Sequence, residues 1–373
     1  RAPCKNLHKA FDLGIHTENC QSKRRIGKGI RVQQTKIRQE DIARVAQVSV
    51  STVSRVLSGS PGISDSTRSR VFKVAADLGG DIAFNPGVYV ASAAMSLKRA
   101  LLFLNEGDAY PGTGEIYPVI VSGLRKAAAK VSLPIEFAMM GGDGEIPQEL
   151  LDGDGTGVLF AGVDTSEGLV NQLIANGNPT VLVNGLDTTM RLDHVAPNNL
   201  FGGMLAARHL IEKGHKSILQ LGTELRWTLR TRSEGFRLGI QMYGNDQVRC
   251  ETIMMPGFKE SHARDAFKSV ASSERFLYDA VFCSADNLAL AIMQELRLKG
   301  LKVPEDVSVL GFNGSPIAEL SSPPLSTLRI NWENIGAEAI RLLLRRAQNP
   351  DAPTQQSLFD AKLIERSSVE SIA

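Results

Sequence analysis

The feature that most restricts the fold is a regular alternation of short apolar runs with helical segments after residue 99. Runs of this length with little internal polarity are typical of strands buried on both faces of a parallel sheet. The runs read ALLFL, PIEFAMM, GVLF, TVLV, SILQL, AVFC and VSVLGF. Between them lie amphipathic segments such as LFGGMLAARHLIEKGH and DNLALAIMQELRLKG. The alternation predicts an α/β fold with helices on both faces of parallel sheets.

The length of this region predicts two lobes. The chain has 373 residues, and residues 99–373 exceed what one hydrophobic core usually holds. Ligands of open α/β sheets bind beyond the carboxyl ends of the strands. We therefore expect a small-molecule site in the cleft between the two lobes.

Charge is distributed unevenly along the chain. Residues 1–99 contain 17 Lys and Arg against 7 Asp and Glu, whereas the rest contains 25 against 33. A basic N-terminal part on an acidic body is typical of a protein that meets a polyanion such as nucleic acid. The alternative is a solvated basic tail, because residues 1–35 alone hold 8 basic and 2 acidic residues.

The stretch DIARVAQVSVSTVSRVL, residues 41–57, predicts two short helices joined by a tight turn. Its first half has an apolar stripe at helical spacing, made of Ile42, Ala43, Val45 and Ala46. The segment 47–49 breaks the stripe, and Ser49 is a good N-cap for a second helix. Val53, Val56 and Leu57 recur at helical spacing and are expected to face inward.

The outer side of the second helix has the chemistry of a DNA-reading surface. Ser51, Thr52 and Arg55 lie on it, with Val50 at its leading end. In a helix–turn–helix the second helix enters the major groove, where Arg binds guanine bidentately and hydroxyls reach bases or phosphates. A third helix, DSTRSRVFKVAADLG, is expected to start after Ser64 and to end at Gly79–Gly80. The alternative is a plain three-helix bundle without a DNA role.

The sequence resembles the lactose/galactose repressor (LacI/GalR) family over roughly residues 37–370. The resemblance rests on DIARVAQVSVSTVSRVLSGSPGISDSTR in the head, and on NNLFGGMLAARHLIEKGHKSILQLG, LRLKGLKVPEDVSVLGFNGSPIAELSSPPLSTLRI and LIERSS in the body. It implies a helix–turn–helix head on a two-lobed body like that of periplasmic binding proteins. It also implies that Val50, Ser51 and Arg55 read bases, and that Ser49, Thr52 and Ser54 contact the DNA backbone. Gln47 and Arg38 depart from the family pattern, which has Gly or Asn, and Ser or Thr, at those positions.

Domain boundaries follow from these patterns. We expect a basic extension at 1–35, a DNA-binding head at 36–80, a hinge at 81–98 and a two-lobed body at 99–373. The resemblance implies that the hinge pairs in a homodimer and wedges leucines into the minor groove, which kinks the duplex. Leu97 is the expected wedge and Met95 the alternative, and a plain flexible linker is the competing interpretation.

The family pattern also places effector-binding residues in the cleft. Arg232 matches an arginine that holds ligand oxygens with its guanidinium fork, and Arg226 and Thr228 precede it at the spacing of nucleobase-binding relatives. Phe258 stands where an aromatic ring stacks on the effector; core packing is its alternative role. Asn313 replaces the usual Asp, and an amide both donates and accepts hydrogen bonds. For Asp286 we expect an N-cap, with a cleft contact as the alternative.

The sequence therefore predicts a cytoplasmic transcription regulator, most simply a repressor. Its partners would be a near-palindromic double-stranded operator and a sugar or nucleobase-like effector, and it would have no membrane association. We find no phosphate loop, nucleophile elbow or His-Glu-x-x-His motif, so no catalytic residue, metal or cofactor is expected. The first residues lack the apolar core of a secretory signal, and the cysteines are only four. The alternatives are an α/β enzyme or a secreted two-lobe binding protein without a DNA role.

Overall fold

The computed structural model describes residues 38–57, 63–77, 97–104, 116–138, 146, 151, 155–271 and 276–372. The chain forms two compact units, and the smaller holds α1, α3 and the first five residues of α2. We call α1 (Gln39–Ala46), α2 (Val50–Leu57) and α3 (Asp65–Asp77) the head, and the described residues from 97 onward the body. The basic extension, the end of the third helix and most of the predicted hinge, including Met95, lie outside the described residues.

The head has the predicted helix–turn–helix order. Its buried apolar residues come from all three helices: Ile42, Ala43, Ala46, Val53, Val56, Val71 and Ala75. One prediction fails, because Val45 is 50% exposed. At about 3.6 residues per turn, Val45 lies beyond Ile42 on the side away from Ala43, at the edge of the face that Ile42, Ala43 and Ala46 bury.

The turn between α1 and α2 requires an unusual backbone conformation. Gln47 ends α1 with φ 52° and ψ 47°, in the left-handed region, which Gly and Asn adopt with less strain than other residues. Gln47 adopts this conformation although it is neither Gly nor Asn, which adds local strain to the turn. Ser49 then caps α2 as predicted, since its Oγ accepts the backbone N–H of Thr52 at 3.0 Å.

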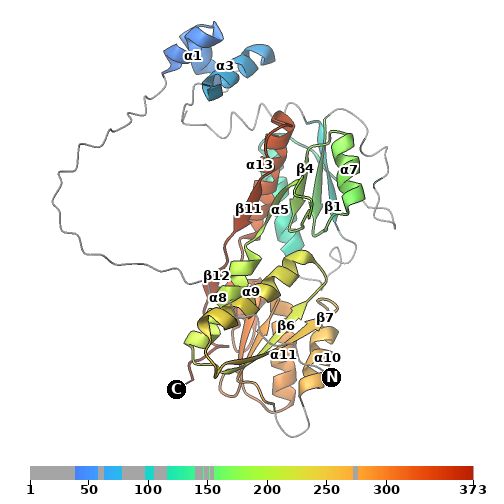
Figure 1. Cartoon of the computed structure of the whole chain (residues 1–373), viewed down its shortest axis with the longest axis vertical. Coiled ribbons are helices and arrows are strands. Elements are labelled where there is room, and N and C mark those ends of the chain that lie inside the picture. Colours follow the sequence, from blue (N-terminus) through green and yellow to red (C-terminus); the bar gives the residue numbers. More distant parts are fainter. Residues whose placement is uncertain are drawn as a thin grey trace, which may run out of the picture. The chain divides into compact units, whose positions relative to one another are not determined.

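The first lobe of the body is a parallel six-stranded sheet with helices on both faces (Figure 1). Its strands, in spatial order, are β11 (Gln356–Phe359), β5 (Asp193–Pro197), β4 (Thr180–Val183), β3 (Thr156–Ala161), β1 (Arg99–Leu104) and β2 (Ile135–Ala138). Leu102 packs on the side of α5 (Ile116–Ala129) and α13 (Trp332–Gln348). Leu101 and Phe103 pack on the side of α7 (Glu167–Ala175). Because its side chains alternate between two buried faces, β1 is apolar from Ala100 to Leu104.

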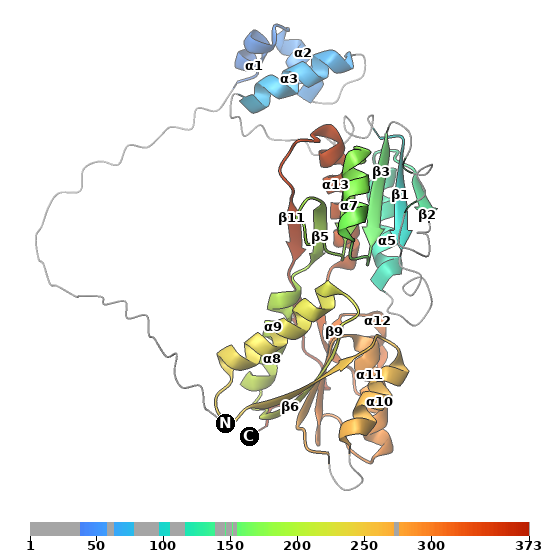
Figure 2. The ribbon, with the colours of Figure 1, turned by 45° about the vertical axis from the view of Figure 1, so that its right-hand side comes forward.

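The second lobe repeats the plan (Figure 2). Its strands, in spatial order, are β12 (Lys362–Ile364), β10 (Ser326–Arg329), β9 (Ser308–Asn313), β8 (Ala280–Cys283), β6 (Ser217–Thr223) and β7 (Arg249–Met255). Only β12 runs antiparallel to its neighbour among these described strands. Helices α8 (Asn199–Glu212) and α9 (Trp227–Tyr243) cover one face of the sheet. Helices α10 (Glu260–Val270) and α11 (Asp286–Leu298) cover the other, and α12 (Pro316–Leu320) is a short helix after β9.

The chain passes between the lobes three times, at 197–199, 329–332 and 359–362. Helix α13 and strand β11 thus return to the first lobe after the second is nearly complete. All seven apolar runs of the sequence contain strands. The more polar strands β5, β7, β10 and β11 were not predicted, because their sequences lack a continuous apolar run.

The structure corrects the prediction for Leu97. This side chain is 6% exposed and belongs to the core of the first lobe. The next residue, Lys98, donates its backbone N–H to the Gly155 carbonyl at 2.7 Å, which ties the segment to the start of β3. A side chain that wedges between base pairs must be exposed, so Leu97 is a core residue in this arrangement.

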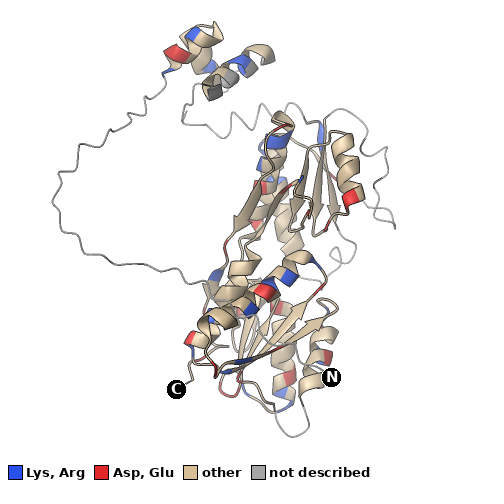
Figure 3. Ribbon diagram, in the orientation of Figure 1, with Lys and Arg blue, Asp and Glu red and all other residues tan. Residues whose placement is uncertain are grey.

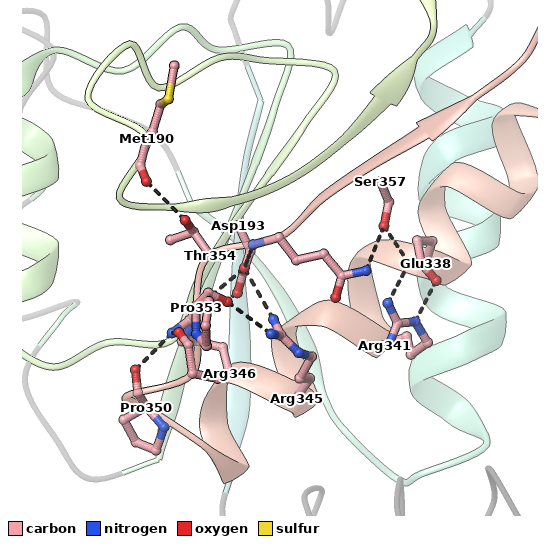
Figure 4. Close-up of polar contacts among 12 residues, drawn as sticks. Met190, Asp193, Glu338, Arg341, Arg345, Arg346, Pro350, Pro353, Thr354 and Ser357 are labelled. Atoms are coloured by element: carbon pink, nitrogen blue, oxygen red, sulfur yellow. Dashed lines mark hydrogen bonds and ion pairs between the residues drawn. The ribbon is translucent and has the colours of Figure 1, made fainter. Parts of the chain in front are cut away.

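A buried ion cluster fixes the loop between α13 and β11 (Figure 4). The carboxylate of Asp193 is fully buried and accepts Nε and Nη2 of Arg346 at 2.8 and 3.0 Å. It also accepts the backbone N–H of Gln355 at 2.6 Å and Nη1 of Arg345 at 3.4 Å. The two guanidinium groups donate in turn to the carbonyls of Pro350, Ala352 and Pro353. One aspartate on β5 therefore holds the chain segment that leads into β11.

None of the described helices is both long and apolar enough to cross a membrane.

Candidate reading helix and interlobe cleft

Helix α2 presents the polar face that the sequence predicted. Ser51, Ser54 and Arg55 are exposed, and Val50 at the leading end is 42% exposed. In Figure 3, the ribbon of the head helices is blue at several Lys and Arg positions. A short, capped helix with an exposed arginine and small hydroxyls has the side-chain chemistry of helices that read base edges in the major groove.

Ser49 organises the start of this face. Besides capping Thr52, its Oγ lies 2.8 Å from the Ser51 hydroxyl and 2.7 Å from the Thr52 hydroxyl. These exposed hydroxyls have rotatable protons and can exchange such local bonds for bonds to phosphate or base edges. The predicted DNA contacts of Ser49, Val50, Ser51, Thr52, Ser54 and Arg55 thus lie on one continuous surface.

In the body, a narrow cavity of about 10 Å³ lies between the lobes. It is lined by Ile116, Asn184, Arg226, Leu229, Arg232, Phe258, Ala285, Asn287 and Asn313. Asn184 directly follows β4, Ala285 closely follows β8, and Asn313 ends β9. The cavity therefore lies at the carboxyl ends of parallel strands from both lobes, where α/β sheets bind ligands.

Arg226 bridges the two lobes. It precedes α9 in the second lobe and is 5% exposed. Its Nη1 donates to the Tyr117 hydroxyl and, at 3.1 Å, to the carbonyl of Gly162, both in the first lobe. The Tyr117 hydroxyl also accepts Nδ2 of Asn184 at 3.2 Å. Arg226 was predicted as an effector ligand, and the structure adds contacts that join the lobes.

The N-terminus of α9 makes a second interlobe bond. The backbone N–H of Trp227 donates to the carboxylate of Asp164 in the first lobe at 2.8 Å. An anion at a helix N-terminus is favoured by the unpaired N–H groups and the helix dipole. Together with the bonds of Arg226, this bond makes the start of α9 a contact point between the two lobes.

Arg232 is the buried cation of the cavity wall. It lies one turn further along α9, is 2% exposed, and its guanidinium lies 3.6 Å from the centre of the Phe312 ring. Nε and Nη2 donate to Oδ1 of Asn199 at 3.0 and 2.8 Å. Nη1 donates to the Ser284 carbonyl and, at 3.4 Å, to Oδ1 of Asn313. Loss of hydration on burial lowers the pKa of Arg232 to about 9.

Close helix packing positions this arginine. A Cβ added at Gly235 on α9 would lie 2.0 Å from the carbonyl oxygen of Leu200 on α8. Only glycine allows this approach, which brings Asn199 of α8 to the guanidinium of Arg232. The same close packing explains Gly203 on α8, where a Cβ would lie 2.2 Å from the Arg232 carbonyl oxygen.

The structure corrects the N-cap prediction for Asp286. Ala285 holds the N-cap position of α11 and Asp286 is its first residue. The Asp286 carboxylate accepts the Thr327 hydroxyl at 2.6 Å and the backbone N–H and hydroxyl of Ser315 at 2.7 and 3.0 Å. Burial raises the pKa of Asp286 to about 6. It joins β10 and the loop after β9, and it is not among the residues that line the described cavity.

The remaining predicted residues lie around the cleft. Phe258 is half-buried and lines the cavity, and its backbone carbonyl accepts Nδ2 of Asn287 at 2.8 Å. Thr228 is buried with no hydrogen-bond partner for its hydroxyl among the described residues. Sequence reasoning missed Asn184, Asn199 and Asn287. Asn184 and Asn287 come shortly after the apolar runs TVLV and AVFC, so their positions could have been predicted from those runs. Asn199 follows β5, which has no such run.

The interlobe bond to Tyr117 gives a prediction. Replacing Tyr117 by Phe removes the hydroxyl that accepts from Arg226 and Asn184, and leaves these buried donors with one acceptor fewer. We expect the closed arrangement to lose about 1–3 kcal/mol. Ligand affinity should fall by about tenfold, as measured by calorimetry, while the thermal midpoint of the head changes little. Exposed Tyr243→Phe is the matched control, and an unchanged ligand affinity in Tyr117→Phe would contradict a closure role.

Comparison with known proteins identifies both parts of the chain. Residues 39–79 match the model of bacterial regulatory proteins of the lacI family, and residues 207–369 match a periplasmic binding protein-like domain. The chain is 30% identical over 341 residues to the HTH-type transcriptional regulator MalR of Streptomyces coelicolor, which covers 89% of this chain and 96% of MalR. It is 27% identical to the ribose operon repressor of Haemophilus influenzae, covering 89% and 98% of the two chains.

Solved structures share the fold. The regulator CelR in complex with cellobiose matches with a TM-score of 0.60 at 24% identity, over 89% of this chain and 100% of that one. The lac repressor dimer bound to operator and the anti-inducer ONPF matches with a TM-score of 0.63 at 20% identity, over 90% and 100%.

A helix–turn–helix head on a two-lobed body with a cleft at the strand ends defines a DNA-binding transcription regulator controlled by a small-molecule effector. The chain belongs to the lacI family of bacterial regulatory proteins. The two relatives compared above are named as a transcriptional regulator and an operon repressor.

Proposed function

We propose that this protein acts in the cytoplasm as a homodimeric repressor on a near-palindromic operator. Two copies of α2, one from each protomer, would read two half-sites, since the symmetry of a dimer is mirrored in the DNA it binds. The exposed row of Ser51, Ser54 and Arg55 on a capped helix is the observation that carries the proposal.

The effector would bind in the interlobe cavity and bias the closure of the lobes. Arg226 and the N-terminus of α9 bond across the cleft, so a ligand that contacts both lobes favours this arrangement. The change in operator affinity can be no larger than the difference in effector affinity between the two arrangements. Among the similar proteins, one is named for a ribose operon and one is solved with cellobiose. For this chain we propose a sugar or a nucleobase-like molecule.

Substitution of Arg55 tests the reading helix. We expect Arg55→Ala to lose about 1–3 kcal/mol of operator binding and to relax selectivity at one base position of each half-site. A gel-shift titration and a selection from randomised DNA measure the two effects. Arg237→Ala removes one exposed arginine from α9 of the body and should leave selectivity unchanged. Unaltered selectivity of Arg55→Ala would contradict the assignment of this residue.

A further inference from the structure

We propose that the ligand of the interlobe cavity is a small monocarboxylic acid, of the sugar-acid type, rather than a neutral sugar. This inference rests on the proposed function and narrows it by naming the chemical class of the effector. Its basis is the balance of charge and hydrogen-bond donors around Arg232.

Arg232 carries a positive charge into the protein interior without a carboxylate bonded to it. Its bonds go to neutral oxygens only: the side-chain amides of Asn199 and Asn313 and the backbone carbonyl of Ser284. A buried charge is costly unless an opposite charge or several strong hydrogen bonds compensate it. The aromatic face of Phe312 offers partial compensation. A negative ligand would supply the missing charge.

The nearest buried carboxylate does not fill this role. Asp286 attracts Arg232 electrostatically, but both of its oxygens are engaged by Thr327 and Ser315. Burial destabilises its charged form as well, as its raised pKa shows. Among the described residues, Arg232 therefore has no carboxylate hydrogen-bonded to it, although Asp286 attracts it electrostatically.

The hydrogen-bonding pattern of Arg232 leaves one edge suited to a carboxylate. The edge formed by Nε and Nη2 is engaged by the Asn199 oxygen. The bond from Nη1 to Asn313 is 3.4 Å long, beyond the usual range for such bonds. Arg232 and Asn313 both line the cavity. A carboxylate there can replace the long bond and accept from both terminal nitrogens in the bidentate geometry that arginine favours.

Asn313 adds to this preference. An aspartate at this position would neutralise Arg232 and would repel an acid. The asparagine instead offers an amide that can donate to a ligand oxygen. On the first lobe, Oδ1 of Asn184, which also lines the cavity, has no partner among the described residues and can accept a ligand hydroxyl. One cation and several neutral groups match one carboxylate and a hydroxylated body better than a dianionic phosphate.

Matched ligand pairs test the inference on the full chain. The pairs are gluconate and glucitol, glucuronate and glucose, and galacturonate and galactose, with glucose 6-phosphate as the phosphate arm and sodium chloride to equalise ionic strength. We expect at least one acid to raise the thermal midpoint at about 1 mM and to bind at least about tenfold more tightly than its neutral partner in calorimetry. A panel in which no acid exceeds its neutral partner, or in which the phosphate arm binds best, overturns the inference.

The substitution Asn313→Asp provides a second test of the acidic ligand. Placing a carboxylate beside Arg232 should weaken binding of the acid by about a hundredfold and weaken the neutral partner much less. Asn313→Ala removes the amide without adding charge, so it should cost the acid about tenfold or less. Equal losses for the acid and the neutral partner in Asn313→Asp would overturn the inference.

The proposed acidic ligand and the proposed regulator role can be refuted independently of each other. A preference for neutral sugars would refute the acidic ligand, while selective DNA binding would still support the regulator role. Absence of selective DNA binding would refute the regulator, whatever ligand the cleft prefers.

Discussion

Replacing Arg232 by alanine is expected to abolish the response to effector. The variant should bind operator with the same affinity in the presence and absence of ligand, as measured by fluorescence anisotropy on operator DNA. Loss of a bidentate, charge-assisted contact of about 3 kcal/mol corresponds to a fall of about a hundredfold in ligand affinity. Calorimetry with the best-binding compound of the panel measures this fall directly.

The control must separate binding from folding. Arg232 is buried, and its removal leaves the Asn199 amide and the Ser284 carbonyl without a donor. Arg232→Met fills most of the volume without charge, and Arg230→Ala removes an exposed arginine two positions earlier on α9. We expect Met to behave like Ala and Arg230→Ala to respond like the natural chain. A full effector response from folded Arg232→Met would contradict the assignment.

Replacing Asp193 by asparagine is expected to destabilise the first lobe by about 3–5 kcal/mol. The variant keeps the size of the side chain but leaves the guanidinium groups of Arg345 and Arg346 without their buried counter-charge. The loop that leads into β11 depends on the same carboxylate. Urea unfolding of the full chain, followed by far-ultraviolet circular dichroism, measures this loss.

The exposed Asp246→Asn serves as the matched control and should change stability by less than about 0.5 kcal/mol. If Asp193→Asn proved as stable as this control, the ion cluster would not be what holds the connection to β11. Double replacement of Arg345 and Arg346 by Met, together with Asp193→Leu, should recover part of the loss, since removing all charges of a buried cluster is cheaper than removing one.

The sequence predicted the features that depend on local pattern. The cap at Ser49, the exposed face of α2 and the buried strands follow from spacing and side-chain type, and each is present. Arg232 lies on α9, which follows β6, and Asn313 ends β9. The two residues lie together because the carboxyl ends of β6 and β9 are at the same edge of one parallel sheet. The likeness to a known family correctly indicated the two lobes and the cleft between them.

The features that it missed depend on contacts between distant segments. Leu97 has the sequence of a hinge residue, yet the start of β3 holds the neighbouring backbone and the side chain enters the core. The bond from Arg226 to Tyr117 joins residues 109 positions apart. The role of Asn199 requires the close packing of α8 on α9 at Gly235. No local pattern carries this information.

Selection from a randomised double-stranded library tests most directly whether α2 reads DNA sequence. The natural chain should enrich a near-palindromic site, and Arg55→Ala should enrich the same site with one position in each half relaxed. Enrichment of no site, or of an identical site by both proteins, would contradict the account.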